Sequence, residues 1–246
     1  MRENFNRRRG KKLERARTAL AALLCALALL PVLARAQEEP PKEEGTFRAP
    51  ELVELKRLDP TIKLDVRYAT ANNFTRRPVY TEARVFLQRP AAEALVRVSR
   101  VLRKKGYGLA VFDGYRPWSV TKLFWDVTPA DKKQFVADPS KGSRHNRGCA
   151  VDLTLYELRT GREVSMPGEY DEMSERSHIS YAGGASGPRR LRDLLRAAME
   201  AEGFAVYEPE WWHYDFKDWR QYPILNISFS EIEKPRAKAT NAAHTK

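Results

Sequence analysis

Cysteine is scarce in this 246-residue chain, which limits how the fold can be held together. The two cysteines are Cys25, inside an apolar run near the N-terminus, and Cys149. If the apolar run is removed, as argued below, the single remaining cysteine cannot form an internal disulfide. The chain must then be stabilised by its hydrophobic core, to which a bound metal ion would add stability.

Signals of several other protein classes are also missing. The sequence has no internal repeat, no glycine-rich phosphate loop and no basic stripe interleaved with aromatic residues. The net charge of +12 is unevenly placed: nine Lys/Arg and two Glu in residues 1–36 contribute +7 and leave +5 for residues 37–246. A charge of that size on a domain says little about partners, so we expect no nucleic-acid ligand.

The N-terminal segment has the order of a secretory signal peptide. A basic region precedes an apolar run over residues 18–33, which Pro31 interrupts, and Ala34-Arg35-Ala36 forms a small-x-small cleavage pattern. The run is short for a membrane span, which favours cleavage over the alternative of an uncleaved anchor. We therefore predict a signal peptide over residues 1–36, export to the periplasm or medium, and no stable membrane insertion afterwards.

The remaining chain predicts one α+β domain over residues 51–230. Residues 37–50 are rich in Glu, Pro and Lys and predict a flexible leader, and the polar tail at 231–246 is expected to be disordered. Hydrophobic periodicity predicts helices over 90–105, 117–127 and 191–199, and strands over 62–66, 109–113, 150–155, 204–206 and 212–216. Residues 159–187, with five glycines and Pro167, predict a long irregular connection. We expect a central, mainly antiparallel sheet with helices packed on one side.

Two of the four histidines lie beside carboxylates. His145 precedes Asp152 by seven residues, and Glu210 precedes His213 by three. Two histidines and one aspartate match the three protein ligands of a catalytic zinc, whose fourth position is left to water. Glu210 could then lie near the metal as a proton acceptor. Taken alone, these spacings also fit ordinary polar pairs near turns. They exclude the His-Glu-x-x-His pattern of helix-borne zinc sites.

Longer motifs carry a resemblance to a known family. The stretch Ser143-Arg-His-Asn-Arg-Gly-Cys-Ala-Val-Asp152 and the stretch Glu210-Trp-Trp-His213 resemble the motif pair of the zinc D-Ala-D-Ala peptidases. This family includes D,D-carboxypeptidases, D-alanyl-D-alanine dipeptidases of the VanX type and the zinc-containing Hedgehog signalling domain. Further blocks look like the dipeptidase branch, namely Asp65-Val-Arg-Tyr-Ala-Thr-Ala-Asn-Asn-Phe74, Asp113-Gly-Tyr-Arg-Pro117, Tyr170-Asp-x-Met173 with Arg176-Ser-His178, and Glu210 to Phe216.

The resemblance implies a role for each matching residue. It implies one Zn²⁺ ion held by His145, Asp152 and His213, with Glu210 as general base and acid toward a metal-bound water. It implies that Arg116 stabilises the oxyanion, a task suited to a fixed guanidinium. Asp171 would receive the ammonium of a D-Ala-D-Ala dipeptide, and Ser143 and Tyr68 are further candidates for holding substrate or ligands.

One departure and two alternative functions remain. The dipeptidase branch often has a second histidine directly after His178, where this chain has Ile179, so we assign His178 a structural role. Cys149 alternates away from Asp152 and is expected to be a packed side chain, not a fourth ligand. The alternatives are a D,D-carboxypeptidase acting on peptidoglycan stem peptides and a non-catalytic, zinc-stabilised binding domain. Glu210 argues against the latter, because a structural zinc needs no adjacent base.

Overall fold

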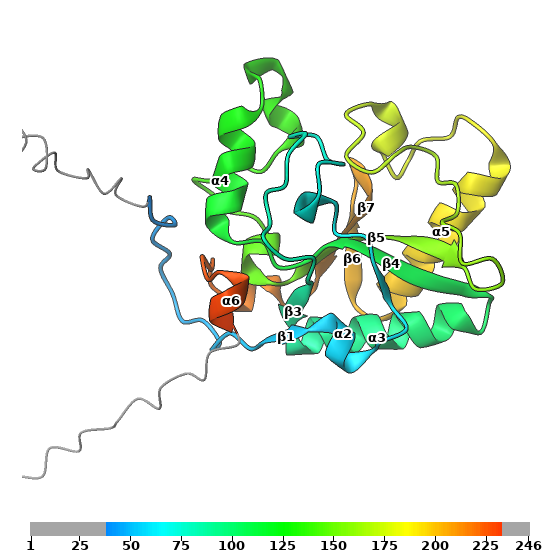
Figure 1. Cartoon of the computed structure of the whole chain (residues 1–246), viewed down its shortest axis with the longest axis horizontal. Coiled ribbons are helices and arrows are strands. Elements are labelled where there is room, and N and C mark those ends of the chain that lie inside the picture. The colour runs from blue at the N-terminus through cyan, green and yellow to red at the C-terminus, as the bar shows by residue number, and fades with distance from the viewer. Residues whose placement is uncertain (1–37, 233–246) are drawn as a thin grey trace, which may run out of the picture. The chain divides into compact units, whose positions relative to one another are not determined.

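A five-stranded sheet forms the centre of the fold (Figure 1). The computed structural model describes residues 38–232, so the predicted signal peptide and nearly all of the predicted tail lie outside the described residues. The strands, in order across the sheet, are β2 (Lys63–Leu64), β4 (Tyr107–Asp113), β5 (Ala150–Glu157), β7 (Glu210–Phe216) and β6 (Phe204–Tyr207). Neighbouring strands are antiparallel, except that β2 runs parallel to β4. The expected α+β class and mainly antiparallel sheet are confirmed.

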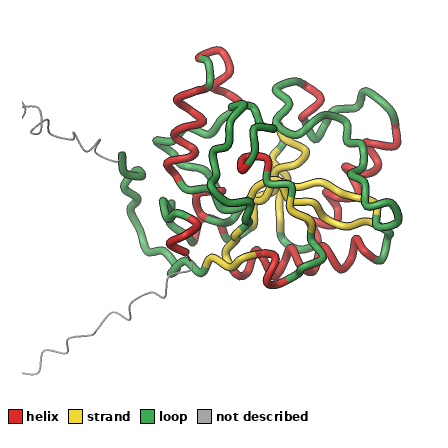
Figure 2. Tube along the Cα trace, in the orientation of Figure 1, coloured by secondary structure: helices red, strands yellow, loops and turns green. Residues whose placement is uncertain are grey.

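Helices surround this sheet, and a small second sheet lies beside it (Figures 1 and 2). The helices α3 (Arg89–Arg103) and α5 (Ser186–Ala201) contact each other. Helix α3 packs against β4, and helix α5 packs against β5 and β6. The second sheet is the antiparallel pair β1 (Leu52–Glu54) and β3 (Phe86–Gln88). The remaining helices are α2 (Leu55–Leu58), α4 (Trp118–Val127) and α6 (Phe229–Ile232). None of the helices between residues 38 and 232 has the length and apolar character that crossing a bilayer requires.

The longest helices follow the hydrophobic periodicity closely. In α3, Leu95, Val98 and Leu102 are fully buried, as their spacing of three and four residues predicts. Pro90 lies in the first turn, and Gly106 adopts a left-handed φ of 88° just after the helix end. The predicted helix over residues 117–127 is likewise present as α4, and the helix around residues 191–199 is present as the longer α5.

Strand β2 is much shorter than predicted. The alternation over residues 62–66 predicts a full strand, but only Lys63 and Leu64 pair with β4. Ile62 and Val66 are nevertheless buried. The alternation of apolar residues therefore reflects burial of one face of this segment beside the sheet. Such a period-two pattern indicates burial of a face, but it does not by itself indicate hydrogen-bonded strand pairing.

The cross-strand register places polar side chains in a row. Asp152 on β5 pairs with Asp113 on one side and with His213 on the other, so the three side chains emerge on one face. In a regular strand over 109–113, Asp113 would share a face with Val111, but a bulge between them changes the register. Because a bulge inserts one extra residue, it turns Asp113 to the face of Asp152.

The segment before β1 has no helix or strand but is attached to the domain. The backbone N–H of Arg48 donates to the carbonyl of Gln221 at 2.7 Å. The Glu43 carboxylate accepts from the N–H of Ile224 at 2.6 Å and pairs with the buried guanidinium of Arg147. The sequence predicts a flexible leader over residues 37–50, but Glu43 and Arg48 within that leader are held against the domain by these contacts.

Candidate metal centre

A short loop before β5 presents the first of the clustered histidines. Residues His145–Arg147 form one 3-10 turn, and Gly148 ends it in a left-handed conformation with φ of 68°. The side-chain amide of Asn146 donates to the carbonyl of Arg116 at 2.9 Å and to the hydroxyl of Thr121 at 2.8 Å. The loop is therefore fastened to the start of α4, and its position does not depend on a metal alone.

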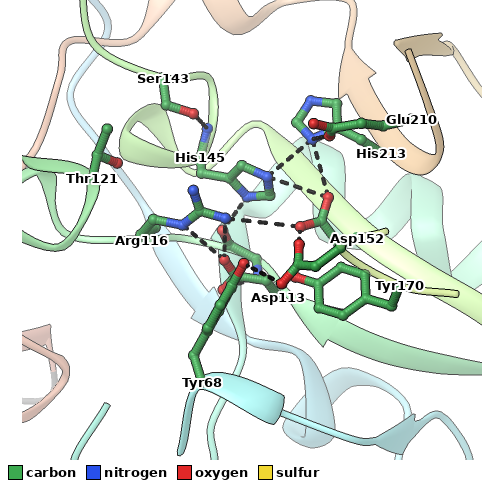
Figure 3. A network of polar contacts seen from close by, with 12 residues as sticks. Tyr68, Asp113, Arg116, Thr121, Ser143, His145, Asp152, Tyr170, Glu210 and His213 are labelled. Carbon is green, nitrogen blue, oxygen red and sulfur yellow. Dashed lines mark hydrogen bonds and ion pairs between the residues drawn. The ribbon is translucent and has the colours of Figure 1, made fainter. Parts of the chain in front are cut away.

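His145, Asp152 and His213 bring one potential ligand atom each to a common point (Figure 3). His145 Nε2 lies 3.0 Å from His213 Nδ1 and 3.3 Å from Asp152 Oδ1, and His213 Nδ1 lies 3.0 Å from Asp152 Oδ1. All three residues are buried. Within the described part of the chain, this is the group of histidine, cysteine and acidic residues that could hold a metal ion.

In each histidine, the ring nitrogen that points away from the common point lies within hydrogen-bond distance of an acceptor oxygen. His145 Nδ1 lies 2.7 Å from the carbonyl oxygen of Gly114, and His213 Nε2 lies 2.9 Å from Asp215 Oδ1. Each of these nitrogens must carry its proton to donate, which leaves the lone pair of the other nitrogen directed at the common point. Metal-binding histidines are oriented in this way by carbonyl and carboxylate acceptors.

The spacing and the charge of this group fit a zinc-sized cation. Ligand atoms about 2.1 Å from a tetrahedral ion lie roughly 3.4 Å apart, close to the separations found here. Burial would raise the pKa of Asp152, but the adjacent His145 and His213 hold it well below its usual range. Burial lowers the pKa of His213, yet its hydrogen bonds to Asp152 and Asp215 raise the pKa to about 10. The surroundings therefore favour positive charge at this point, which a metal ion would supply.

Glu210 lies beside His145, Asp152 and His213 but is not one of the three residues whose ligand atoms converge. It begins β7, and its Oε2 lies 3.8 Å from His213 Nδ1, the nitrogen that faces the common point. Burial raises the pKa of Glu210, and the negative charge of Asp152 raises it further. A carboxyl group with a raised pKa next to a metal site is suited to accepting and returning a proton.

Arg116 is held rigidly on the other side of Asp152. Its Nε and Nη2 donate to Asp113 Oδ2 at 2.9 and 2.7 Å, and Nη2 lies 3.8 Å from Asp152 Oδ2. The guanidinium also packs over the rings of Tyr68 and Phe124. A buried cation fixed by a carboxylate and two aromatic faces is preorganised to meet negative charge that develops near the ligands.

The site opens into a cavity of about 480 Å³. Asp171, Tyr68 and Ser143 all line it, as do Glu210 and the three candidate metal ligands. The hydroxyl of Tyr68 donates to Asp171 Oδ2 at 2.9 Å. Burial and the charge of Asp152 raise the pKa of Asp171 to about 8. Ser143 has a further role, because its hydroxyl oxygen accepts the backbone N–H of His145 at 3.2 Å.

The structure also includes residues that the motif reasoning gave no role. Asp113 fixes Arg116, Asp215 fixes His213, and the hydroxyl of Tyr170 donates to Asp152 Oδ2 at 3.1 Å. Asp113 and Tyr170 lie inside the matching blocks, and Asp215 follows His213 at the spacing that keeps two side chains on one strand face. These positions were visible in the sequence, but their contacts were not.

The two residues predicted to be structural lie away from the common point. His178 is partly exposed, with its Nδ1 3.6 Å from Glu208 Oε2, and it does not line the cavity. Cys149 is fully buried, and its burial raises the pKa of the thiol to about 12. Cys149 is therefore a packed core side chain, and it is not among the residues that bring ligand atoms to the common point.

Two imidazoles and one carboxylate around a common point, with a further carboxylate beside them, form the arrangement of a metal-dependent hydrolase. A family model described as D-Ala-D-Ala dipeptidase, of peptidase group M15, matches residues 48–234. The chain belongs to this metallopeptidase family.

Two sequence relatives agree with the family match. The chain is 36% identical to the D-alanyl-D-alanine dipeptidase of Escherichia coli over 75% of this chain and 94% of that protein. It is 37% identical to the D-alanyl-D-alanine dipeptidase of Enterococcus faecium over 68% of this chain and 92% of that protein. A solved structure of the D,D-dipeptidase VanXYg, in complex with a D-Ala-D-Ala phosphinate analogue, aligns with a TM-score of 0.35 and 17% identity. That alignment covers 70% of this chain and 68% of the other.

Proposed function

We propose that this protein is a zinc-dependent dipeptidase that hydrolyses free D-Ala-D-Ala. The observation that carries the proposal is the convergence of His145, Asp152 and His213 in a cavity that also contains Glu210 and Asp171. Two nitrogens and one oxygen suit zinc, and a bound ion of this kind acidifies water and polarises a carbonyl group.

The protein side chains divide the remaining work. The Asp171 carboxylate, held by Tyr68, binds the ammonium group of the dipeptide and places the scissile peptide bond beside the ligands. Glu210 takes a proton from the attacking water and returns it to the leaving amine. Arg116, locked by Asp113, stabilises the negative charge that grows on the carbonyl oxygen.

The ammonium anchor separates a dipeptidase from a carboxypeptidase. In the substrate of a carboxypeptidase, the nitrogen of the residue before the scissile bond is acylated and uncharged. Such an enzyme therefore needs no acidic side chain to bind an ammonium group there. Asp171 in the cavity is partly buried and has no ion-pair partner among residues 38–232, and Arg116 acts on it only through its charge at longer range. A substrate ammonium would supply that partner, because a buried carboxylate is costly unless it is paired.

The proposal is tested by substrate choice and by one conservative variant. The purified protein should cleave D-Ala-D-Ala, should not cleave an N-acylated D-Ala-D-Ala peptide or L-Ala-L-Ala, and should lose activity with a chelator. Cleavage of only the acylated peptide would favour the D,D-carboxypeptidase instead. Glu210→Gln should abolish turnover while zinc content, measured by atomic absorption, stays at one ion. Loss of the metal in that variant would make Glu210 a ligand.

We also propose that the protein acts outside the cytoplasm, in cell-wall peptide metabolism. The support is the order of basic region, apolar run and small-residue cleavage pattern in residues 1–36. Fractionation of cells that express the full chain, with N-terminal sequencing of the product, tests this. A product that keeps its N-terminus and pellets with membranes would identify an uncleaved anchor.

A further inference from the structure

Four cationic side chains line the cavity, and three of them are already engaged. Arg116 is buried against Asp113. Arg147 donates to the carbonyl of Tyr222 and pairs with Glu43. Lys141 pairs with Asp138 Oδ2 at 3.7 Å, and 82% of its side chain is exposed. Arg144 is the fourth.

Two contacts orient the Arg144 side chain, but its terminal nitrogens remain available as hydrogen-bond donors. Its Nε lies 3.4 Å from Asp215 Oδ2, and its guanidinium stacks over the Trp219 ring at 4.9 Å. Within residues 38–232, its terminal nitrogens have no hydrogen-bond partner, and 42% of the side chain is exposed. Nε itself is buried without a hydrogen bond. The guanidinium is therefore aimed by two contacts while its outer edge remains open to a ligand in the cavity.

The position of Arg144 is opposite to that of the predicted ammonium anchor. Asp215 joins Arg144 to the outer nitrogen of His213, which places Arg144 on the His213 side of the ligands. Asp171 lies with Tyr68 on the Arg116 side. The cavity thus presents the Asp171 carboxyl group on one side of His145, Asp152 and His213 and the open edge of the Arg144 guanidinium on the other.

We propose that Arg144 binds the free C-terminal carboxylate of the dipeptide. The inference rests on the dipeptidase function proposed above and names the second end of its substrate. An extended dipeptide spans roughly 7 Å, so binding of its ammonium by Asp171 and of its carboxylate by Arg144 would hold its peptide bond between these two side chains, within the cavity that His145, Asp152 and His213 also line. The planar guanidinium matches a carboxylate with two parallel hydrogen bonds. Recognition of both charged ends would select a free dipeptide by its length.

The test compares D-Ala-D-Ala with its C-terminal amide, which keeps the ammonium group and lacks the carboxylate. The variants are Arg144→Met and Arg144→Lys. The matched control is Arg220→Met, because Arg220 stacks on the same Trp219 ring at 4.1 Å but does not line the cavity. For each protein, kcat and KM are measured for both substrates, together with bound zinc.

Arg144→Met should lower kcat/KM for the free dipeptide by on the order of tenfold or more, mainly through KM, and leave the amide unchanged. Arg144→Lys should recover part of the loss, and Arg220→Met should behave as wild type. An equal loss on both substrates, or a fall in zinc content, would mean that Arg144 only supports Asp215 and His213, which overturns the inference but not the dipeptidase function. A wild-type protein that cleaves neither substrate would overturn both.

Discussion

The contact between Asp113 and Arg116 yields the sharpest stability prediction. Asp113 is 1% exposed and accepts four hydrogen bonds: two from Arg116, one from the Tyr80 hydroxyl at 2.8 Å and one from the Gly114 N–H at 2.8 Å. The change Asp113→Ala removes the carboxylate and leaves a buried guanidinium whose next acid, Asp152, is 3.8 Å away.

The expected cost follows from this geometry. Removing one partner of a buried ion pair costs about 3–5 kcal/mol, because the remaining charge stays desolvated. The Tyr80 hydroxyl and the Gly114 N–H would also lose their acceptor, which adds to the penalty, and entry of water offsets part of it. We therefore expect Asp113→Ala to lower the free energy of unfolding by about 3–5 kcal/mol and Tm by roughly 6–20 °C.

Urea unfolding of the zinc-loaded protein, followed by tryptophan fluorescence, measures this change. Glu202→Ala serves as the control, because Glu202 pairs with Arg97 at 2.6 Å while half of the Arg97 side chain is exposed. Such a surface pair should be worth about 1 kcal/mol or less. The double variant Asp113→Ala/Arg116→Met removes both charges and should be more stable than Asp113→Ala. A loss under about 1 kcal/mol, or a double variant no more stable than the single one, would refute the reasoning.

Three further predictions concern the metal, pH and the loop before β5. Chelation should abolish activity and lower Tm, and zinc at 100 times its Kd should restore about 2.7 kcal/mol of stability in a thermal scan. In the metal-free protein, burial and Asp152 raise the pKa of Asp171 to about 8, so the folded state keeps a proton that the unfolded chain releases near pH 4. Unfolding free energy should therefore fall between pH 4 and pH 8, and Asp171→Asn should flatten that slope in urea titrations; an unchanged slope would contradict the assignment. Gly148→Ala should cost about 1–2 kcal/mol, because φ is 68° and the new Cβ would lie 2.5 Å from Leu52 Cδ2; wild-type unfolding curves would disprove this.

The sequence determines the local elements of this protein and the identity of its reactive groups. The buried face of α3 and the alternation in β5 are periodic patterns that require no partner to be recognised. The motifs at His145 and His213 likewise identify imidazole and carboxylate groups that could bind a metal ion, although their spacing alone also fits ordinary polar pairs.

Only the tertiary structure decides which side chains meet. The pairing of Asp152 with both Asp113 and His213 depends on a bulge in β4 and on a register between strands that are far apart in the chain. Local periodicity cannot specify register by itself, because a slip of two residues between strands leaves every side chain on the same face, so long-range packing must select the pairing. The supporting contacts of Asp215 and the open guanidinium of Arg144 depend on the same register. The sequence thus supplied the chemistry of the site, while cross-strand packing determined its geometry.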